Sequence, residues 1–193
     1  MGPGVELDFG VPQGPLVELA TALRELNGFF VFNAGIQVFR AGTEGLGYDL
    51  EHWNEPATWK EAYGGMADDL FCFGQDLFGA QFAIVDGIQV VVMDPETGER
   101  HHLGDTLEEW VVWLFADPEH NGHSDTARGW QDEFGPLDLT ERLIHPRPLI
   151  LGGEPSVDNA IVIDGVNAMR SLGPLAVAIR DLPEGTPIEF HLD

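Results

Sequence analysis

The chain has 193 residues, 44% of them apolar, which is enough for one well-filled hydrophobic core and excludes general disorder. Nine lysines and arginines stand against 33 aspartates and glutamates, so the formal net charge at pH 7 is −24. This balance argues against direct binding to nucleic acid, because the neutralisation of phosphates requires a basic surface. Two interpretations of the acidity stay open: solubility or adaptation to salt, and attraction of a basic partner.

Three further features bear on location. The first residues, MGPGVELDFG, lack the basic start and apolar centre of a signal peptide. No apolar run approaches the roughly 20 residues that a membrane span needs. Cys72 is the single cysteine, so an intramolecular disulfide cannot form. We therefore expect a cytoplasmic protein that is not bound to a membrane.

The N-terminal quarter predicts one helix followed by a hairpin. Residues 1–14 are rich in Gly and Pro and are expected to form a loose lead-in. From Pro15 to Asn27 the leucines follow helical spacing. Two short apolar runs, 29–32 and 36–39, then predict two strands joined across residues 33–35. A helix and then a hairpin favour an α+β architecture over alternating βαβ units.

An aromatic segment comes next. Trp53 is expected to begin a short helix that has Asn54 or Glu55 near its cap and Pro56 in its first turn, and that ends by residues 64–65. Trp53, Trp59 and Tyr63 place three aromatic side chains within eleven residues. Core packing explains them, and an aromatic patch that binds a partner is the alternative.

The central segment, 70–116, predicts several short strands that lead into a helix. Apolar clusters at 71–73, 82–85 and 90–93 are each bounded by Gly, Asp or Gln and are typical of strands. The run from Asp94 to Gly98 predicts a hairpin turn. Thr106 and Glu109 have the spacing of a capping box that opens a helix. Four apolar residues are expected to share one face of this helix: Leu107, Trp110, Val111 and Leu114.

The C-terminal third is predicted to hold two helices and two strands. A helix over 125–134 is expected behind a Ser124 cap, with Ala127, Trp130 and Phe134 on one face. Residues 143–151 contain Pro146 and Pro148 on either side of Arg147 and are expected to be extended. Strands are predicted at 160–163 and 187–191, and a helix over 166–179 that is broken near Gly173 and Pro174. With no internal repeat and no linker, a single domain over residues 1–193 is expected.

The sequence contains no complete catalytic motif, so we predict no catalytic, cofactor-binding or metal-ligating residue and no enzymatic activity. Two imidazoles, His120 and His123, are spaced by three residues but lack the HExxH pattern. Cys72 lies between two phenylalanines and is expected to be a buried, inert thiol. A metal-dependent hydrolase remains an alternative, using residues between 101 and 125: His101, His102, Asp117, His120, His123 and Asp125.

The order of several motifs resembles the SUKH superfamily, which includes the yeast cell-wall assembly regulator and many bacterial proteins encoded beside toxins. The aromatic strand and FG step of 69–79 come first, then the hairpin around DPETGE at 94–99, and then the helix with its central EW at 109–110. The resemblance covers about residues 50–192 and is strongest over 69–115, whereas residues 1–45 resemble no family. It implies a central mixed or mainly antiparallel sheet flanked by helices, and a role in binding proteins.

Bacterial members of this superfamily are typically immunity proteins that neutralise a cognate toxin, often a nuclease. The resemblance and the acidity together predict an immunity protein that binds a basic toxin domain. The alternative of the same fold is a regulatory or scaffold protein. The predicted contact residues are four carboxylates and two aromatic anchors: Asp68, Asp69, Asp76, Asp86, Trp53 and Trp59.

Overall fold

The computed structural model describes residues 2–183 and 186, so the strand predicted at 187–191 lies outside the described residues. Six strands form one antiparallel sheet in which each strand pairs with the next along the chain. Their bounds are β1 Phe29–Val31, β2 Ile36–Val38, β3 Leu70–Asp76, β4 Gln81–Val85, β5 Gln89–Met93 and β6 Arg100–Gly104. The predicted α+β class and the central antiparallel sheet are therefore confirmed.

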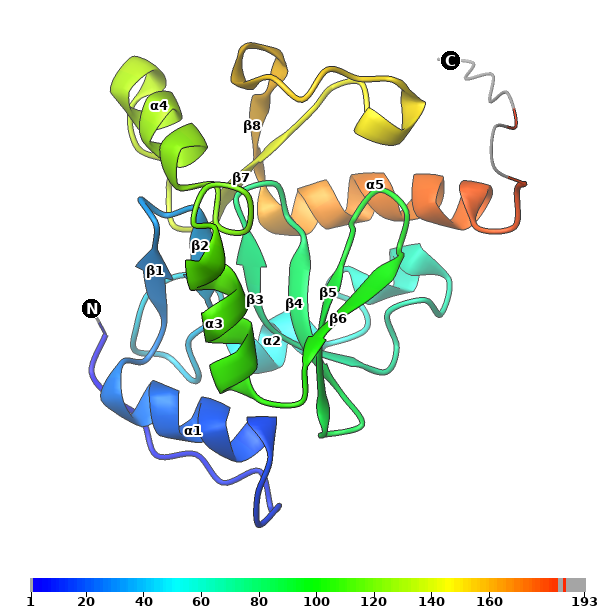
Figure 1. Cartoon of the computed structure of the whole chain (residues 1–193). Coiled ribbons are helices and arrows are strands. Elements are labelled where there is room, and N and C mark those ends of the chain that lie inside the picture. Colours follow the sequence, from blue (N-terminus) through cyan, green and yellow to red (C-terminus); the bar gives the residue numbers. More distant parts are fainter. Residues whose placement is uncertain (1, 184–185, 187–193) are drawn as a thin grey trace.

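Helices cover both faces of this sheet, and a second, smaller sheet lies beyond one of its ends (Figure 1). The helices are α1 Pro15–Glu25, α2 Leu50–Asn54, α3 Leu107–Ala116, α4 Ser124–Phe134 and α5 Gly165–Ile179, with 3-10 turns η1 Lys60–Tyr63, η2 Leu149–Leu151 and η3 Val157–Asn159. The small sheet pairs β7 Glu141–Ile144 with β8 Ile161–Asp164. The amide of Leu143 donates to the carbonyl of Leu77 at 3.0 Å, which joins β7 to the turn after β3.

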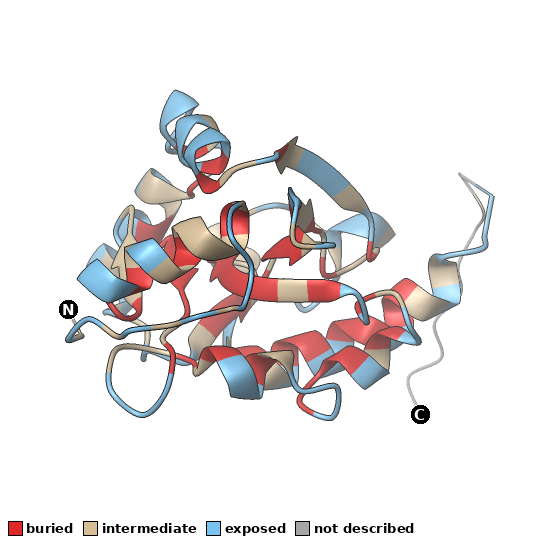
Figure 2. Ribbon diagram, turned by 90° about the horizontal axis from the view of Figure 1, so that it is seen from below, coloured by how far each residue is buried: buried red, intermediate tan, exposed pale blue. Residues whose placement is uncertain are grey.

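The core has an aromatic cluster on each face of the sheet. On one face the ring of Trp110 in α3 meets the rings of Phe73 and Phe82, with centroids 5.0 and 5.4 Å away. On the other face Trp53 of α2 packs 4.4 Å from Tyr48 and 4.9 Å from Phe39. Buried residues gather where strands and inward helix faces meet (Figure 2). The sheet is thus held between two layers of helices.

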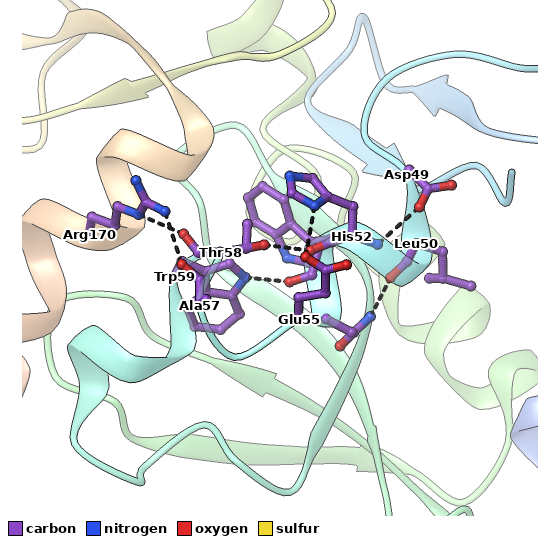
Figure 3. Close-up of polar contacts among 10 residues, drawn as sticks. Asp49, Leu50, His52, Glu55, Ala57, Thr58, Trp59 and Arg170 are labelled. Atoms are coloured by element: carbon purple, nitrogen blue, oxygen red, sulfur yellow. Dashed lines mark hydrogen bonds and ion pairs between the residues drawn. The ribbon is translucent and has the colours of Figure 1, made fainter. Parts of the chain in front are cut away.

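The predicted helix at Trp53 begins earlier than expected. It runs over Leu50–Asn54, because the carboxylate of Asp49 accepts the amide of His52 at 2.9 Å and caps its first turn. Asn54 is therefore the last helical residue and not the cap, and the chain continues into the separate turn η1. Figure 3 shows how Arg170 of α5 donates to the carbonyls of Thr58 and Ala57, at 2.6 and 2.9 Å, and so ties this segment to α5.

The predicted start of α3 is confirmed. The hydroxyl of Thr106 accepts the amide of Glu109 at 3.1 Å, and the carboxylate of Glu109 accepts the amide of Asp105 at 2.6 Å. Of the four apolar residues placed on one face, Leu107, Trp110 and Leu114 are buried. Val111, which was expected on the same face, is 40% exposed and lies at the edge of the buried face.

Replacement of Thr106 by alanine is expected to destabilise the protein by about 1 kcal/mol, because the amide of Glu109 loses its partner. Ser124→Ala is the matched control. Ser124 is the first residue of α4 and does not cap it, since the residue at the cap is His123, in the left-handed region at φ 52°. Urea denaturation should show a change of no more than about 0.5 kcal/mol for Ser124→Ala. An equal loss for both variants would contradict the assigned caps.

Other C-terminal predictions are also corrected. Trp130 and Phe134 share one face of α4 as predicted, with ring centroids 4.4 Å apart, but Ala127 and Trp130 are buried whereas Phe134 is 55% exposed. The segment 143–151 is not extended throughout, because Leu149–Leu151 forms the turn η2. Helix α5 continues through Pro174 instead of breaking there. The lack of a side chain at Gly173 allows a close approach to η1, since a Cβ there would lie 2.7 Å from the carbonyl oxygen of Ala62. This packing supports the helix across the proline.

The N-terminal lead-in contains no helix or strand among residues 2–14 but packs on the core. Val5, Leu7 and Phe9 lie against buried residues. The amide of Val5 donates to the carbonyl of Leu23 at 3.1 Å, and the ring of Phe9 meets that of Phe71 at 5.6 Å. These residues therefore form part of the folded unit.

Candidate functional site

The two predicted aromatic anchors lie inside the protein. Trp53 is 0% and Trp59 1% exposed. The indole of Trp53 donates to Oε1 of Gln81 at 2.8 Å, and that of Trp59 donates to the carbonyl of Trp53 at 2.9 Å. Neither ring can reach a partner, so their prediction as contact residues was wrong. Both are core residues whose polar atoms are satisfied internally.

The four predicted carboxylates do not form one surface. At one end of the β3–β4 pair Leu70 pairs with Val85, so Asp86 lies at that end. Asp76 is the last residue of β3 and lies at the opposite end of the pair. Asp68 and Asp86 are exposed. Asp69 is exposed but forms a two-bond ion pair with Arg100, at 2.8 and 2.7 Å. The hydrogen bond from Arg100 lowers the pKa of the Asp69 carboxyl. Asp76 is only 8% exposed.

The histidine-rich region between residues 101 and 125 does not converge. His102 contacts Asp105 at 3.0 Å, whereas the imidazole of His123 contacts Asp76 at 3.0 Å. Within the described part of the chain, no group of three or more His, Cys, Asp or Glu side chains could hold a metal ion. His102 and His123 therefore contact different carboxylates, and the region does not form the common metal site that the hydrolase alternative needs.

Asp76 organises the turn between β3 and β4. Its Oδ1 accepts the amides of Phe78 and Ala80 at 2.9 and 2.8 Å, and its Oδ2 contacts Nε2 of His123. Burial alone would lower the pKa of His123, but the hydrogen bond and charge of Asp76, with the charge of Glu119, raise it above its usual value. The pair therefore joins the sheet to the start of α4.

The raised pKa of His123 predicts a pH-dependent contribution to stability. A group whose pKa is higher in the folded state stabilises fully below its unfolded value of about 6.5 and loses that stabilisation as pH rises through the folded value. The difference in unfolding free energy between wild type and His123→Asn should therefore be largest near pH 6 and shrink towards pH 9. Asparagine suits the left-handed backbone at this position.

Urea denaturation across this pH range measures the effect, with His102→Asn as the control. His102 forms an exposed pair with Asp105, and such pairs contribute little. A difference for His123→Asn that grows with pH would contradict the assignment.

A cavity of about 1040 Å³ lies at the end of the sheet that carries Asp76. We call it the end cavity. Its walls are the turn after β3, the turn after β5, the start of α4, the segment 144–157 and Leu172 of α5. The turn after β5 is joined to the opposite wall by Glu96, whose carboxylate accepts the amides of Leu149 and Ile150 at 3.0 and 2.9 Å. Distant parts of the chain therefore form one site.

The end cavity combines an apolar floor with carboxylates. Its apolar lining comes from Phe78, Ile144, Leu149, Ile150, Val157 and Leu172. Its acidic lining comes from Asp76, Asp94, Glu96, Glu119 and Asp125. The ring of His145 stacks on Phe78, with centroids 5.0 Å apart and an interplanar angle of 13°. Burial lowers the pKa of His145, so its ring is neutral at pH 7.

An exposed apolar strip runs along α3. Val111 is 40%, Val112 64% and Phe115 63% exposed. The ring of Phe115 meets that of Phe32 edge-on at 5.1 Å. Glu108 precedes this α3 strip and Asp117 follows it, and both are exposed. The strip was not predicted, because only Leu107, Trp110, Val111 and Leu114 were assigned to a face of this helix. The helical spacing of Glu108, Val112 and Phe115 was the available signal.

Cys72 is completely buried, as predicted, and burial raises the pKa of its thiol to about 12. It is therefore protonated and shielded from reagents at neutral pH. No helix among the described residues has the length and apolar character needed to cross a membrane.

No protein-family model matches the sequence, and no curated protein matches it. Among solved structures, the chain is similar to the crystal structure of Atu4351 from Agrobacterium tumefaciens, with a TM-score of 0.54 and 14% sequence identity. The match covers 83% of this chain and 75% of that chain. The likeness at this identity concerns the fold.

Proposed function

We propose that this chain is a non-enzymatic protein-binding module of SUKH type, an immunity protein that binds and neutralises a basic toxin in the cytoplasm. The observation that carries the proposal is the α3 strip, an exposed apolar surface on an otherwise strongly acidic protein. Contiguous exposed apolar residues with polar neighbours are typical of protein interaction sites. The motif order of residues 69–115 supports the family.

The α3 strip has the composition of an interface centre. Phe115 offers a large ring, and Val111 and Val112 extend the apolar surface by one helical turn. The flanking carboxylates of Glu108 and Asp117 supply a polar rim. A complementary partner therefore presents an apolar patch edged with lysine or arginine.

The long-range charge favours the same kind of partner. Between residues 41 and 99 the chain has twelve carboxylates and one lysine or arginine, Lys60. Lys60 is only 4% exposed, and its ammonium donates inward to Asn54 and to the carbonyl of Leu70, at 3.0 and 2.6 Å. Eight of the twelve carboxylates are exposed, whereas Asp76 is buried and Asp49, Asp94 and Glu96 are half-buried, so the exposed ones have little compensation from within this stretch. Such a surface accelerates the approach of a basic protein.

Co-expression tests the proposal. Cells that express the toxin encoded beside this chain's gene should survive when the chain is present and die without it. Survival that is unchanged by the chain, or a gene neighbourhood without a toxin, would overturn the immunity function. The alternative of a regulatory or scaffold protein would be supported by tight binding of the neighbouring gene product without protection of the cells.

Phe115→Asp is expected to weaken binding of the toxin at least about tenfold, because it places a charge at the centre of the proposed interface. Phe134→Asp is the matched control: Phe134 is 55% exposed and lies on Trp130 of its own helix, at 4.4 Å. Calorimetric titration should give an affinity for the control within about twofold of wild type. Equal losses for the two variants, at unchanged melting temperature, would exclude the α3 strip as the interface.

A further inference from the structure

The end cavity has a charge imbalance that points to its ligand. Five carboxylates line it, and among the described residues no lysine or arginine does. The neutral His145 adds no positive charge, and His123, which pairs with Asp76, offsets one of the five carboxylates. A cation that enters the cavity therefore meets an excess of negative charge, in a recess where the potential is less screened than on a flat surface.

The folded chain itself holds the carboxylates in place. Oδ1 of Asp94 accepts the amides of Glu96 and Thr97, at 2.7 and 3.1 Å. Oε1 of Glu119 accepts the hydroxyl of Thr126 at 2.6 Å, and its Oε2 accepts the amide of Asp125. Asp125 pairs through Oδ1 with Arg128, at 2.7 Å, which does not line the cavity. A carboxylate has about four acceptor positions, so Oδ2 of Asp94, Oδ2 of Asp125 and a second position on Oε1 of Glu119 remain for a ligand.

The apolar floor adds a second requirement. Leu149 and Ile150 are 41% and 50% exposed in the lining. The ring of Phe78 stacks on His145 and meets His123 edge-on at 5.1 Å. A hydrated metal ion or a simple polyamine would leave this floor without a partner. A cation attached to an apolar or aromatic stem satisfies both the carboxylates and the floor, and a cavity of about 1040 Å³ has room for such a molecule.

His145, which lines the end cavity, carries a buried nitrogen without a partner in the described part of the chain. It is 7% exposed, and its Nε2 has no hydrogen-bond partner among the described residues. A buried polar atom without a partner is costly, and such atoms are rare unless a ligand or water completes them. The atom belongs to a side chain that lines the end cavity.

We propose that the end cavity binds an organic cation: a guanidinium, amidinium or ammonium group carried on an apolar or aromatic stem. The cation is held among Asp94, Glu119 and Asp125, and the stem packs on Phe78 and Leu149. Two sources supply this chemistry, a free small molecule and an arginine or lysine side chain in a peptide segment. The site is separate from the α3 strip and does not depend on the proposed function.

Nuclear magnetic resonance titration of the full chain tests the site. The probes are benzamidine as a free cation, N-acetyl-phenylalanyl-arginine amide as a peptide-borne one, and benzamide as the neutral analogue of benzamidine. At least one cation is expected to shift the amide signals of Phe78, Thr97 and His145, and to bind at least about tenfold more tightly than benzamide. Tighter binding of the dipeptide assigns a peptide segment, and tighter binding of benzamidine assigns a free small molecule.

Charge-neutral variants separate the site from general attraction. The double variant Asp94→Asn, Asp125→Asn retains an oxygen acceptor at each position, and the single variant Asp125→Asn changes only an exposed residue of α4. The control Asp68→Asn, Asp86→Asn removes the same charge from residues that do not line the cavity. The double variant should weaken binding about tenfold and the single variant about threefold, whereas the control should weaken it less than twofold. Equal losses in all variants, binding of benzamide at the same affinity, or no shift with either cation would overturn the proposal.

Discussion

Trp53→Ala is expected to destabilise the protein by about 3–5 kcal/mol, the cost of removing a fully buried aromatic side chain from a packed core. The indole is 0% exposed and packs against Tyr48, Phe39 and Trp59. Its loss also leaves Oε1 of Gln81 without the indole donor. Since small domains are stable by only about 5–15 kcal/mol, this loss removes a large fraction of the total free energy of unfolding.

Two further variants separate packing from the hydrogen bond. Trp53→Phe keeps most of the apolar contact and should cost about 1–3 kcal/mol, mainly from the unpartnered Gln81. Ile88→Ala, at a side chain that is 61% exposed, should change stability by no more than about 0.5 kcal/mol. Guanidinium denaturation followed by tryptophan fluorescence measures all three. A loss below about 1 kcal/mol for Trp53→Ala would contradict its place in the core.

Asp76→Ala has the second largest expected effect, a loss of about 3 kcal/mol. The substitution removes the acceptor for the amides of Phe78 and Ala80 and the partner of His123. Because His123 stands at the start of α4, the loss of Asp76 also weakens the contact between the sheet and α4. The same turn lines the end cavity.

Asp76→Asn is the informative comparison, because its side-chain oxygen can still accept both amides. It should recover about half of the loss, with the charge of the pair still missing. Asp68→Ala, at an exposed position, serves as the control and should stay within about 0.5 kcal/mol of wild type. Thermal and urea unfolding at pH 7 provide the values. A stability of Asp76→Ala equal to that of Asp68→Ala would exclude the organising role of this carboxylate.

Local sequence signals predicted much of the central segment. The strands β3, β4 and β5 match the apolar runs that predicted them, and the spacing of Thr106 and Glu109 located the start of α3. These features depend on residues close in the chain, so the sequence carries them directly. The hairpin of β1 and β2 was also predicted from two short apolar runs that are neighbours in the chain.

Errors arose where distant residues decide the structure. Helix α5 continues through Pro174 because it packs on η1, a contact between segments about 110 residues apart. Trp53 is likewise buried by residues distant in sequence, since it packs against Phe39 and donates to Gln81 of β4. Aromatic residues in a polar segment are equally compatible with a core and with an interface, so only the tertiary structure separates the two.

The candidate sites show the same limit. The end cavity joins Asp94, His123 and His145, which lie in three turns that no local pattern connects. Two of the predicted carboxylates, Asp76 and Asp69, proved to be engaged within the chain, by His123 and by Arg100. Acid content predicted the overall charge of the surface, whereas the partners of each carboxylate depend on the fold.

The central claim, that the chain binds and neutralises a basic toxin, is tested most directly by calorimetric titration of the purified toxin domain from the neighbouring gene. The titration is run at about 50 mM and about 500 mM NaCl, between which the screening length falls from roughly 14 to roughly 4 Å. We expect a 1:1 complex with submicromolar affinity at low salt, at least about tenfold weaker binding at high salt, and loss of toxin activity at equimolar ratio. No binding at low salt, or a complex in which the toxin stays fully active, would contradict the account.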